Sequence, residues 1–388
     1  MTETAGYPTP GRRLRLGMVG GGQSGLVGHW HWTGARVSAR WDLVAGALSS
    51  KPEVARASGR AWNLPEDRIY SDFKEMAKSE GAREDGIDAV AICTPNHLHR
   101  PVAEAFMEAG IDIICDKPMA NTLEDCAALE AQAKECGVVF AITHPYIYHP
   151  MVRQARAMIA QGALGAIRQV VVEYVQDHAT LPDDRPGSVW RQDPARVGRA
   201  QTTGDIGTHT FQMLEWVTGQ DVTRLRADFH VCGYDKPLED TAFIKMDLAG
   251  GAPAMMWITQ AAPGNYCGLS FRIYGDRAGL EWHQEFPEHL RFRPIGAPEQ
   301  TIVRGHGAGM LPEAERMITL PRGHGEALSD AWGNLYREIA IAVEARRDGG
   351  SVPPGMLALP GIEDGTRGVR FVHAAADSHE AGGVWTAL

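Results

Sequence analysis

Short apolar runs alternate with helical stretches over the first part of the chain. The runs are LRLGMVG, WDLVAGAL, GIDAVAICT, IDIICD and VVFAITH, and segments such as PVAEAFMEAG and TLEDCAALEAQAKECG separate them. Continuous apolar strands that alternate with helices are typical of a parallel sheet covered on both faces. The pattern therefore predicts a doubly wound α/β fold over residues 14–145. Residues 1–13 are predicted to be a disordered lead-in.

The pattern changes beyond residue 146. Alternating or aromatic-rich runs such as AIRQVVVEYVQ, TAFIKMDL, APAMMWITQ and GLSFRIYG follow, with Gly- and Pro-bearing turns between them. Such runs predict a mostly antiparallel sheet built from hairpins, with one face open. Helices are expected near 326–347 and 361–379. We therefore predict a second α/β domain over residues 146–388 for substrate binding and oligomerisation, with a long loop at 177–204 of the kind that is often functional.

Composition excludes several classes of function. The 388 residues suit two domains, and the formal net charge is −10. No long basic run indicates nucleic acid, and no apolar run approaches the roughly 20 residues of a membrane span. The N-terminus does not resemble a signal peptide, and the six cysteines have neither C-x-x-C nor framework spacing. A cytoplasmic protein with no nucleic-acid or membrane partner is expected.

The first apolar run leads directly into a glycine-rich turn, GMVGGGQSG. Gly20, Gly22 and Gly25 have G-x-G-x-x-G spacing, and Gln23 and Ser24 lie inside the turn. Glycines permit a tight turn and let backbone N–H groups approach a pyrophosphate at a helix N-terminus. Because the turn stands between a strand and a helix, it predicts dinucleotide binding rather than an ordinary loop.

The end of the second run bears on the choice between NAD and NADP. An acid usually binds the ribose 2′-hydroxyl of NAD at this position, yet none occurs before Glu53. Ser49, Ser50 and Lys51 stand there instead, and they would suit a 2′-phosphate or accept either cofactor. The sequence predicts a nicotinamide dinucleotide and leaves NAD and NADP open.

The third run ends in CTPNHLH. Its strand exit is expected to flank the cofactor crevice, because ligands bind at the carboxyl edge of such sheets. His97 is two residues from the next histidine, so the two do not share a helix face, and no metal site is predicted. The candidate cofactor contacts here are Thr94, Pro95, Asn96 and His99.

A second informative stretch is TTGDIGTHTFQMLEWVTG. Its apolar residues follow a helical period, which places Asp205 and His209 on an adjoining face in the first turns. A carboxylate beside an imidazole orients the ring and tunes it as a base near neutral pH. Taken alone, the stretch narrowly favours an N-cap aspartate and a solvent-facing histidine over a catalytic pair.

Several motifs occur in a characteristic order. They are GMVGGGQSG, CTPNHLHRPVAEAFMEAGIDIICDKPMANTLED, HPMVRQARAMIAQGALG and GDIGTHTFQMLEWVTG. Together they resemble the glucose–fructose oxidoreductase, inositol dehydrogenase and rhizopine-catabolism (Gfo/Idh/MocA) family over nearly the whole chain. The resemblance implies an NAD(P)-dependent enzyme with a Rossmann domain and an open-faced sheet, forming a homodimer or homotetramer.

The resemblance also implies catalytic residues. The family's Glu-Lys-Pro motif falls on Asp116, Lys117 and Pro118, with Asp in place of Glu, beside the cofactor. Lys117 is expected to reach the substrate hydroxyl next to the nicotinamide and to stabilise the alkoxide. The family's Asp-x-x-x-His motif falls on Asp205 and His209, so His209 is expected to be the general base, held by Asp205.

Further residues are candidate substrate contacts. The family's domain-junction motif falls on THPYIYHP, and the long loop offers aromatic and polar groups that suit a sugar ring and its hydroxyls. Besides Asp205 and His209, the candidates are His144, Tyr146, His149, His178, Trp190 and Arg191.

The arginines of the long loop leave an alternative open. Clustered arginines suit an anionic group on the sugar, but they also pair with nearby acids. The residues concerned are Arg185, Arg191, Arg196 and Arg199, with Asp183, Asp184 and Asp193 as the acids.

Three functions are weighed. The first is hydride transfer between a secondary alcohol of a sugar, polyol or cyclitol and the nicotinamide. The second is an NAD-dependent glycosidase that works by transient oxidation and elimination, which needs a further acid or base such as Tyr146, Tyr148 or His178. The third is a non-catalytic sugar sensor, which the retained Lys117, Asp205 and His209 disfavour.

Overall fold

The computed structural model describes residues 12–388 except 24, 183–188, 306 and 308. The chain forms two compact units. The first contains residues up to Met119, Glu124–Pro145 and Leu328–Glu363, and the second contains Ala120–Leu123, Tyr146–Ala327 and Asp364–Leu388. Each unit is described by itself below. No helix in the described parts of the chain is both long and apolar enough to cross a membrane.

The first unit contains a parallel five-stranded sheet with the order β2-β1-β3-β4-β5. Its central strands are almost wholly buried, as expected for a sheet covered on both faces. The predicted doubly wound fold is thereby confirmed. The strands are β1 (Leu14–Gly20), β2 (Trp41–Ala47), β3 (Ala89–Cys93), β4 (Asp112–Cys115) and β5 (Phe140–Ile142). The helices are α1 (Leu26–Ser38), α2 (Pro52–Ala61), η1 (Glu66–Arg68), α3 (Phe73–Ala82), η2 (Asn96–Leu98), α4 (His99–Glu108), α5 (Leu123–Cys136) and α10 (Leu328–Arg347), whereas all of η3 (Pro145–Tyr148) but its first residue belongs to the second unit.

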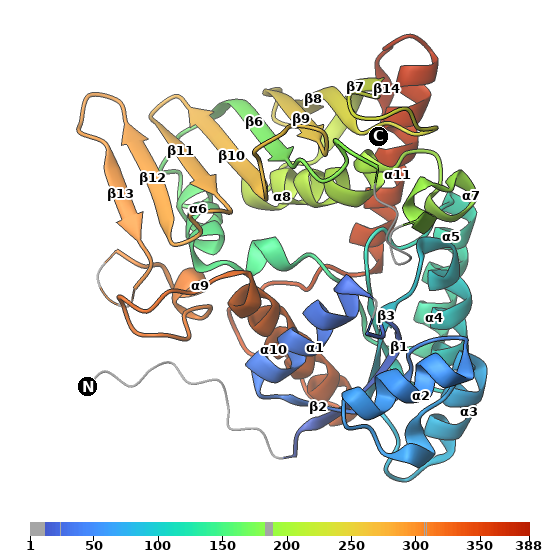
Figure 1. Cartoon of the computed structure of the whole chain (residues 1–388). Helices are drawn as coiled ribbons and strands as arrows, with labels where there is room; N and C mark the ends of the chain where they lie inside the picture. Colours follow the sequence, from blue (N-terminus) through green and yellow to red (C-terminus); the bar gives the residue numbers. More distant parts are fainter. Residues whose placement is uncertain (1–11, 24, 183–188, 306, 308) are drawn as a thin grey trace. The chain divides into compact units, whose positions relative to one another are not determined.

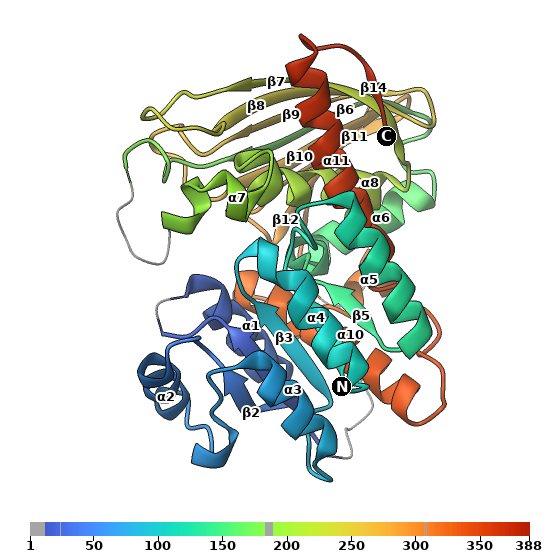
Figure 2. The same cartoon turned by 90° about the vertical axis from the view of Figure 1, so that its right-hand side faces the viewer.

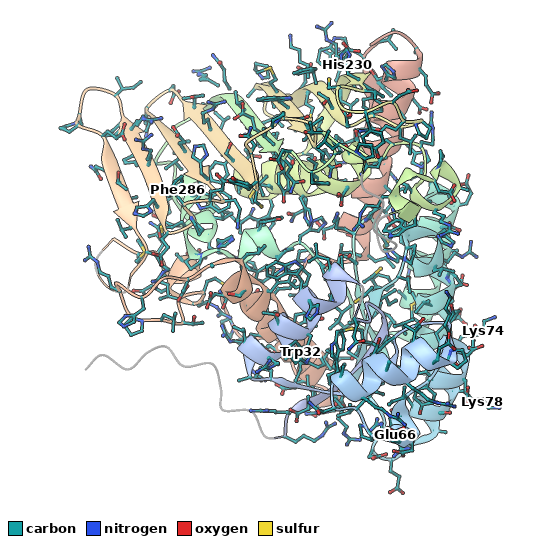
Figure 3. All side chains as sticks on the ribbon, viewed as in Figure 1. Trp32, Glu66, Lys74, Lys78, His230 and Phe286 are labelled. Carbon is teal, nitrogen blue, oxygen red and sulfur yellow. The ribbon has the colours of Figure 1, made fainter. Side chains whose placement is uncertain are left out.

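Helix α10 packs on α1 although the two are far apart in sequence (Figure 1). Tyr336 of α10 is central to this contact: its hydroxyl lies 2.6 Å from Nδ1 of His31, and its carbonyl accepts a hydrogen bond from Trp41. Trp32 of α1, labelled in Figure 3, stacks on Trp62. The His-Trp-His-Trp run of α1 therefore serves packing. Helical periodicity predicted a helix near 326–347, but pattern alone did not reveal that it joins this unit.

The second unit contains a nine-stranded sheet with the order β13-β12-β11-β10-β6-β9-β8-β7-β14. Only the β6–β9 pair is parallel among its strand pairs in the described residues, which confirms the predicted mostly antiparallel sheet. The strands are β6 (Ile167–Val175), β7 (Val222–His230), β8 (Thr241–Leu248), β9 (Pro253–Thr259), β10 (Gly268–Gly275), β11 (Ala278–His283), β12 (His289–Pro294), β13 (Gln300–Val303) and β14 (Thr386–Ala387). The helices are α6 (Pro150–Ala160), η4 (Val189–Gln192), α7 (Pro194–Val197), η5 (Thr203–Gly207), α8 (Thr208–Thr218), α9 (Pro312–Glu315) and α11 (Ile362–Glu380).

The two faces of this sheet differ. Helices α6 and α8 run along one face, as Figures 1 and 2 show, and Phe211 of α8 stacks on Phe371 of α11. On β8 and β9 buried and exposed residues alternate, so that Phe243 and Met255 on the opposite face are exposed to solvent. The alternation is that of a sheet with one open face.

The close approach of α1 and α10 makes Gly34 a sensitive position. A Cβ there would lie 2.7 Å from Cδ2 of Tyr336 and 3.0 Å from the carbonyl oxygen of Trp332. We predict that Gly34→Ala lowers stability by about 1–3 kcal/mol, because overpacking outweighs the higher helix propensity of alanine. In Gly368→Ala, a helical control whose nearest neighbour is a methyl 3.9 Å away, stability should stay equal or rise. Thermal unfolding of both variants checks this, and an unchanged midpoint for Gly34→Ala would contradict it.

Candidate active site

The turn between β1 and α1 has the geometry of a dinucleotide-binding loop. Gly20 has φ +76° and Gly21 has φ +67°, a region that favours glycine. Gly20 is also in register with Cys93 at the end of β3, and a Cβ on it would lie 2.8 Å from the carbonyl oxygen of that residue. Gly25 caps α1 from an extended conformation. The predicted contact Ser24 lies outside the described residues.

Gly22 brings the turn close to the end of β2. A Cβ on Gly22 would lie 2.9 Å from the carbonyl oxygen of Leu48 and 2.8 Å from Oγ of Ser58. Gln23 is exposed, and its backbone N–H donates to the same Oγ over 3.3 Å. Glycine at this position therefore lets the backbone of the turn pack closely against the end of β2 and α2.

The exit of β2 has no carboxylate, as the sequence indicated. Ser49 Oγ accepts a hydrogen bond from the backbone N–H of Lys51 over 3.2 Å, and Ser50 and Lys51 are exposed. Glu53 is exposed in the first turn of α2. The side chains near the expected ribose position are thus two hydroxyls and an ammonium group.

Two strand exits are tied together by His99. The buried ring lies 2.9 Å from the carbonyl oxygen of Pro118 through Nδ1 and 2.9 Å from that of Thr94 through Nε2. We therefore assign His99 to positioning the loops after β3 and β4, because both ring nitrogens already face backbone groups. In the loop after β3, Pro95 directly precedes η2, and Asn96 is the buried first residue of η2.

The acid of the Asp-Lys-Pro motif has a defined partner. Oδ1 of the half-buried Asp116 accepts a hydrogen bond from Oγ1 of Thr143 over 2.6 Å, so the aspartate is held despite being shorter than the family's glutamate. Lys117 is half-buried directly after β4, and its peptide bond with Pro118 is cis. Burial, together with the positive charge of Lys117, lowers the pKa of His144 to about 3, so this histidine is neutral.

These features fit a nicotinamide dinucleotide. The glycine turn lies beside β3, where the strand order 2-1-3 reverses direction, and ligands bind at such switch points. Oγ1 of Thr94 is buried without a hydrogen-bond partner among the described residues, so a polar group that enters this edge would satisfy it. Gly20–Gly25, Thr94 and the β4 exit would hold the cofactor.

In the second unit, the Asp-x-x-x-His motif spans a change of helix type. Asp205 lies in η5, a π-helical turn, and His209 lies in the first turn of α8. Both are half-buried, and the edge of the Tyr146 ring faces His209 with 5.0 Å between ring centroids. An ordinary helix was predicted over both residues. The π turn is a difference, and such turns are frequent at functional sites.

A buried amide holds the aspartate. Nε2 of Gln260 donates to Oδ2 of Asp205 over 2.8 Å, and Gln260 is wholly buried at the end of β9. Its Oε1 lies 3.0 Å from Nε2 of Gln201 and 3.0 Å from Oγ1 of Thr202. Asp205 therefore has a fixed neighbour that lies 55 positions away in sequence.

The start of η5 is fixed by a second buried group. The carboxylate of Glu239 accepts hydrogen bonds from the backbone N–H groups of Gln201 and Thr203 over 2.9 and 2.8 Å. Burial raises its pKa. Sequence reasoning missed both Gln260 and Glu239, because no local spacing links them to the Asp-x-x-x-His motif.

Three predicted substrate contacts are buried: His144, described above, Tyr146 and His149. Tyr146 shares a 2.6 Å hydrogen bond with the hydroxyl of Tyr174, and burial raises its pKa well above the ordinary value. His149 packs against Trp282, and its Nε2 has no hydrogen-bond partner among the described residues. Burial lowers the pKa of His149 to about 4. Tyr146 is therefore placed beside His209, whereas His149 is part of the core.

A small pocket in the second unit brings loop residues together. His178 and Arg191, both predicted substrate contacts, line it with Gln201, Lys236 and Gln260. The guanidinium of Arg191 lies 4.9 Å from the centre of the Trp190 ring, in a cation–π contact. Gln260 therefore both lines the pocket and binds Asp205.

The other described arginines of the long loop are paired. Arg196 forms an ion pair with Asp193 at 3.3 Å, as one alternative anticipated. Arg199 instead binds Asp377 and Glu380 at 2.6 and 2.8 Å. These contacts favour the pairing interpretation over a cluster of anion-binding arginines. Arg185, Asp183 and Asp184 lie outside the described residues.

Known protein families match both halves of the chain. A model described as an oxidoreductase family with an NAD-binding Rossmann fold matches residues 14–144, and one described as the GFO/IDH/MocA C-terminal domain matches residues 152–281. The chain belongs to the Gfo/Idh/MocA oxidoreductase family. It is therefore an enzyme with an NAD-binding Rossmann domain, of the inositol and sugar dehydrogenase type. The predicted resemblance is confirmed.

Individual relatives extend over the whole chain. An oxidoreductase structure from Sinorhizobium meliloti shares 42% identity and a TM-score of 0.87, covering 97% of this chain and 99% of that one. An inositol dehydrogenase homolog from Azotobacter vinelandii, complexed with NAD+, shares 35% identity and a TM-score of 0.93, covering 97% and 98%. The oxidoreductase YfiI of Bacillus subtilis is 33% identical, covering 96% of each chain.

The buried, neutral histidines predict a loss of stability in acid. In the unfolded chain His149 takes up a proton near pH 6.5, whereas in the folded state it does so only near its pKa of about 4. Its contribution is therefore complete above pH 6.5 and lost as the pH falls towards 4, by about 3 kcal/mol in full. We expect His149→Phe to have a shallower dependence of unfolding free energy on pH, with a residual slope from His31 and His144. Urea unfolding between pH 7.5 and 4.5 measures this, and identical slopes would contradict it.

Proposed function

We propose that this enzyme transfers a hydride between a secondary alcohol of a cyclitol, polyol or sugar and the nicotinamide of NAD. The family match supports NAD-dependent redox chemistry. The Azotobacter vinelandii relative is complexed with NADH and myo-inositol in a structure that shares 34% identity and a TM-score of 0.90. That relative supports a polyhydroxylated ring as the substrate, and NAD rather than NADP as the cofactor.

The observation that carries this proposal is the half-buried Asp205–His209 turn with its buried amide. Cofactor binding alone needs neither residue. A carboxylate held by Gln260 over 2.8 Å, four positions before a half-buried imidazole on the same helical stretch, is the equipment of a general base. Removal of a hydroxyl proton is what alcohol oxidation requires of the protein.

The proposed roles follow from the chemistry of each side chain. Bound NAD supplies the hydride acceptor. His209 takes the hydroxyl proton, and Asp205 stabilises the imidazolium that results. Lys117 donates a charged hydrogen bond to the developing alkoxide, which is strongest where water is excluded. In the reductive direction His209 returns the proton to the carbonyl oxygen.

The redox-assisted glycosidase gains no support from the candidate acids. Tyr146 is buried against Tyr174 with a pKa raised well above the ordinary value, which makes it a poor donor or acceptor of protons near neutral pH. Tyr148 is wholly buried. His178 lines the pocket and is the remaining candidate.

Absorbance at 340 nm tests the proposal with NAD and myo-inositol, then with a panel of aldoses, anhydrosugars and glycosides. We expect NADH to form with a cyclitol or sugar, and Lys117→Met to lower kcat by about 10²–10³-fold, the usual effect of removing a donor to an oxyanion. Lys74→Met is the matched control, because Lys74 is an exposed lysine of the same unit, on α3 (Figure 3). Its kcat should equal that of the parent enzyme.

Two outcomes would contradict the proposal. Absence of NADH formation across the panel would remove the dehydrogenase function. Release of free sugar from a glycoside that depends on NAD without net NADH formation would instead indicate the glycosidase.

We propose further that the open face of the large sheet joins copies of this chain. On this face Phe243 stacks on Trp257 with 6.4 Å between centroids, and His230, labelled in Figure 3, meets the edge of Phe243 at 5.9 Å. Phe243 and Met255 line a groove and are 48% and 52% exposed. Contiguous apolar surface of this kind marks an interaction site.

If the open face is the interface between copies, negative charge added to it should prevent association. Phe243→Glu combined with Met255→Glu should shift the protein from dimer or tetramer to monomer in sedimentation velocity, because burying unpaired carboxylates opposes association. Phe286→Glu, at an exposed residue between β11 and β12, is the control and should leave the sedimentation coefficient unchanged (Figure 3). A parent protein that sediments as a monomer would overturn this proposal.

A further inference from the structure

Gln260 is held more firmly than its position in the sequence suggests. It follows β9 directly and is wholly buried. Its backbone N–H donates to the carbonyl oxygen of Asp240 over 2.8 Å, and its carbonyl oxygen accepts from the backbone N–H of Ala179 over 2.7 Å. Because both backbone groups are hydrogen-bonded, the side chain extends from a fixed position in the second unit.

The neighbours of the side-chain amide define which way it faces. Its Oε1 lies 3.0 Å from the amide nitrogen of Gln201 and 3.0 Å from the hydroxyl of Thr202, both of which can donate. Its Nε2 lies 2.8 Å from the carboxylate of Asp205, which in its ionised form only accepts. A flipped amide would place oxygen against carboxylate and NH2 against the amide nitrogen of Gln201. The NH2 group is therefore directed at Asp205.

We propose that Gln260 is a positioning residue of the reaction, which acts through Asp205 to hold the carboxylate ionised and oriented for His209. This inference rests on the proposed function. A hydrogen bond to the charged form of a carboxylate favours that form, and in a buried setting the effect is stronger than in water. The negative charge on Asp205 in turn favours the protonated imidazole that forms when His209 takes the substrate proton.

The geometry separates this role from general structural support. Gln260 touches Asp205, whereas the side-chain hydrogen bonds of the buried Gln154 of α6 go, within the described part of the chain, to the backbone of Gly309 and Leu311. Gln154→Met therefore removes a comparable buried amide without altering the surroundings of the candidate base. It is the matched control for any loss of stability that accompanies substitution of Gln260.

Two substitutions of Gln260 test the role by the pH dependence of kcat. Gln260→Met removes the donor, and we expect kcat to fall about 10–100-fold, less than loss of the whole base, with the acidic limb moved to lower pH because His209 becomes a weaker base. The KM for NAD should stay within about twofold. Gln260→Glu should be most active at low pH, where the introduced carboxyl is protonated and donates to Asp205, and should lose activity as the pH rises and two carboxylates face each other. Gln154→Met should keep the pH profile of the parent enzyme.

A second readout needs no substrate. Diethyl pyrocarbonate modifies neutral imidazole, so the pH dependence of its reaction at His209, followed by peptide mass spectrometry, reports the protonation of that ring. In Gln260→Met we expect the midpoint to fall by at least half a pH unit, because the carboxylate charge next to the ring is less well held. The midpoint in Gln154→Met should equal that of the parent protein.

The outcomes distinguish this inference from the proposed function. If Asp205→Asn abolishes turnover while Gln260→Met changes neither the kcat profile nor the His209 midpoint, the positioning role is wrong and the proposed function stands. If Asp205→Asn retains full turnover, the proposed role of Asp205 is wrong, and the positioning role of Gln260, which acts through Asp205, is wrong with it. If no substrate of the panel is turned over, the His209 midpoint alone decides whether Gln260 acts through Asp205: a shift supports the role, and an unchanged midpoint overturns it.

Discussion

The hydrogen bond from Gln260 to Asp205 is the interaction on which the proposed base depends. It joins the end of β9 to the π turn before α8, across 55 positions of sequence, and it holds the carboxylate that stands four positions before His209. Glu239 fixes the start of the same turn by accepting two backbone N–H groups. The sheet therefore does more than support α8, because its strand ends supply the groups that define the reactive turn.

The Rossmann unit uses a comparable arrangement around Lys117. His99 lies between the carbonyl oxygens of Thr94 and Pro118, and Thr143 holds the acid that precedes the lysine. In both units a buried polar side chain, bound to groups distant in sequence, fixes a loop that bears a reactive residue. Such supports matter because small displacements of a reactive group lower the rate strongly. The residues that place the chemistry thus outnumber those that perform it.

Local patterns of the sequence predicted much of the fold and part of the candidate site. The apolar runs predicted the parallel sheet, the glycine spacing predicted the turn after β1, and the alternation on β8 and β9 predicted the open face. The features that these patterns did not predict depend on contacts between segments that are distant in sequence. The packing of α10 on α1 and the contact of Gln260 with Asp205 have no periodic or short-range signal. His149 looked like a pocket residue, but its burial is a tertiary property.

A double-mutant cycle on kcat with NAD and the best cyclitol or sugar tests the central claim most directly. It compares Asp205→Asn, Gln260→Met and the double variant with the parent enzyme. If Gln260 acts through Asp205, the double variant should be no slower than Asp205→Asn alone, because the amide has no carboxylate left to hold. Losses that multiply would show two independent contributions and would contradict the account.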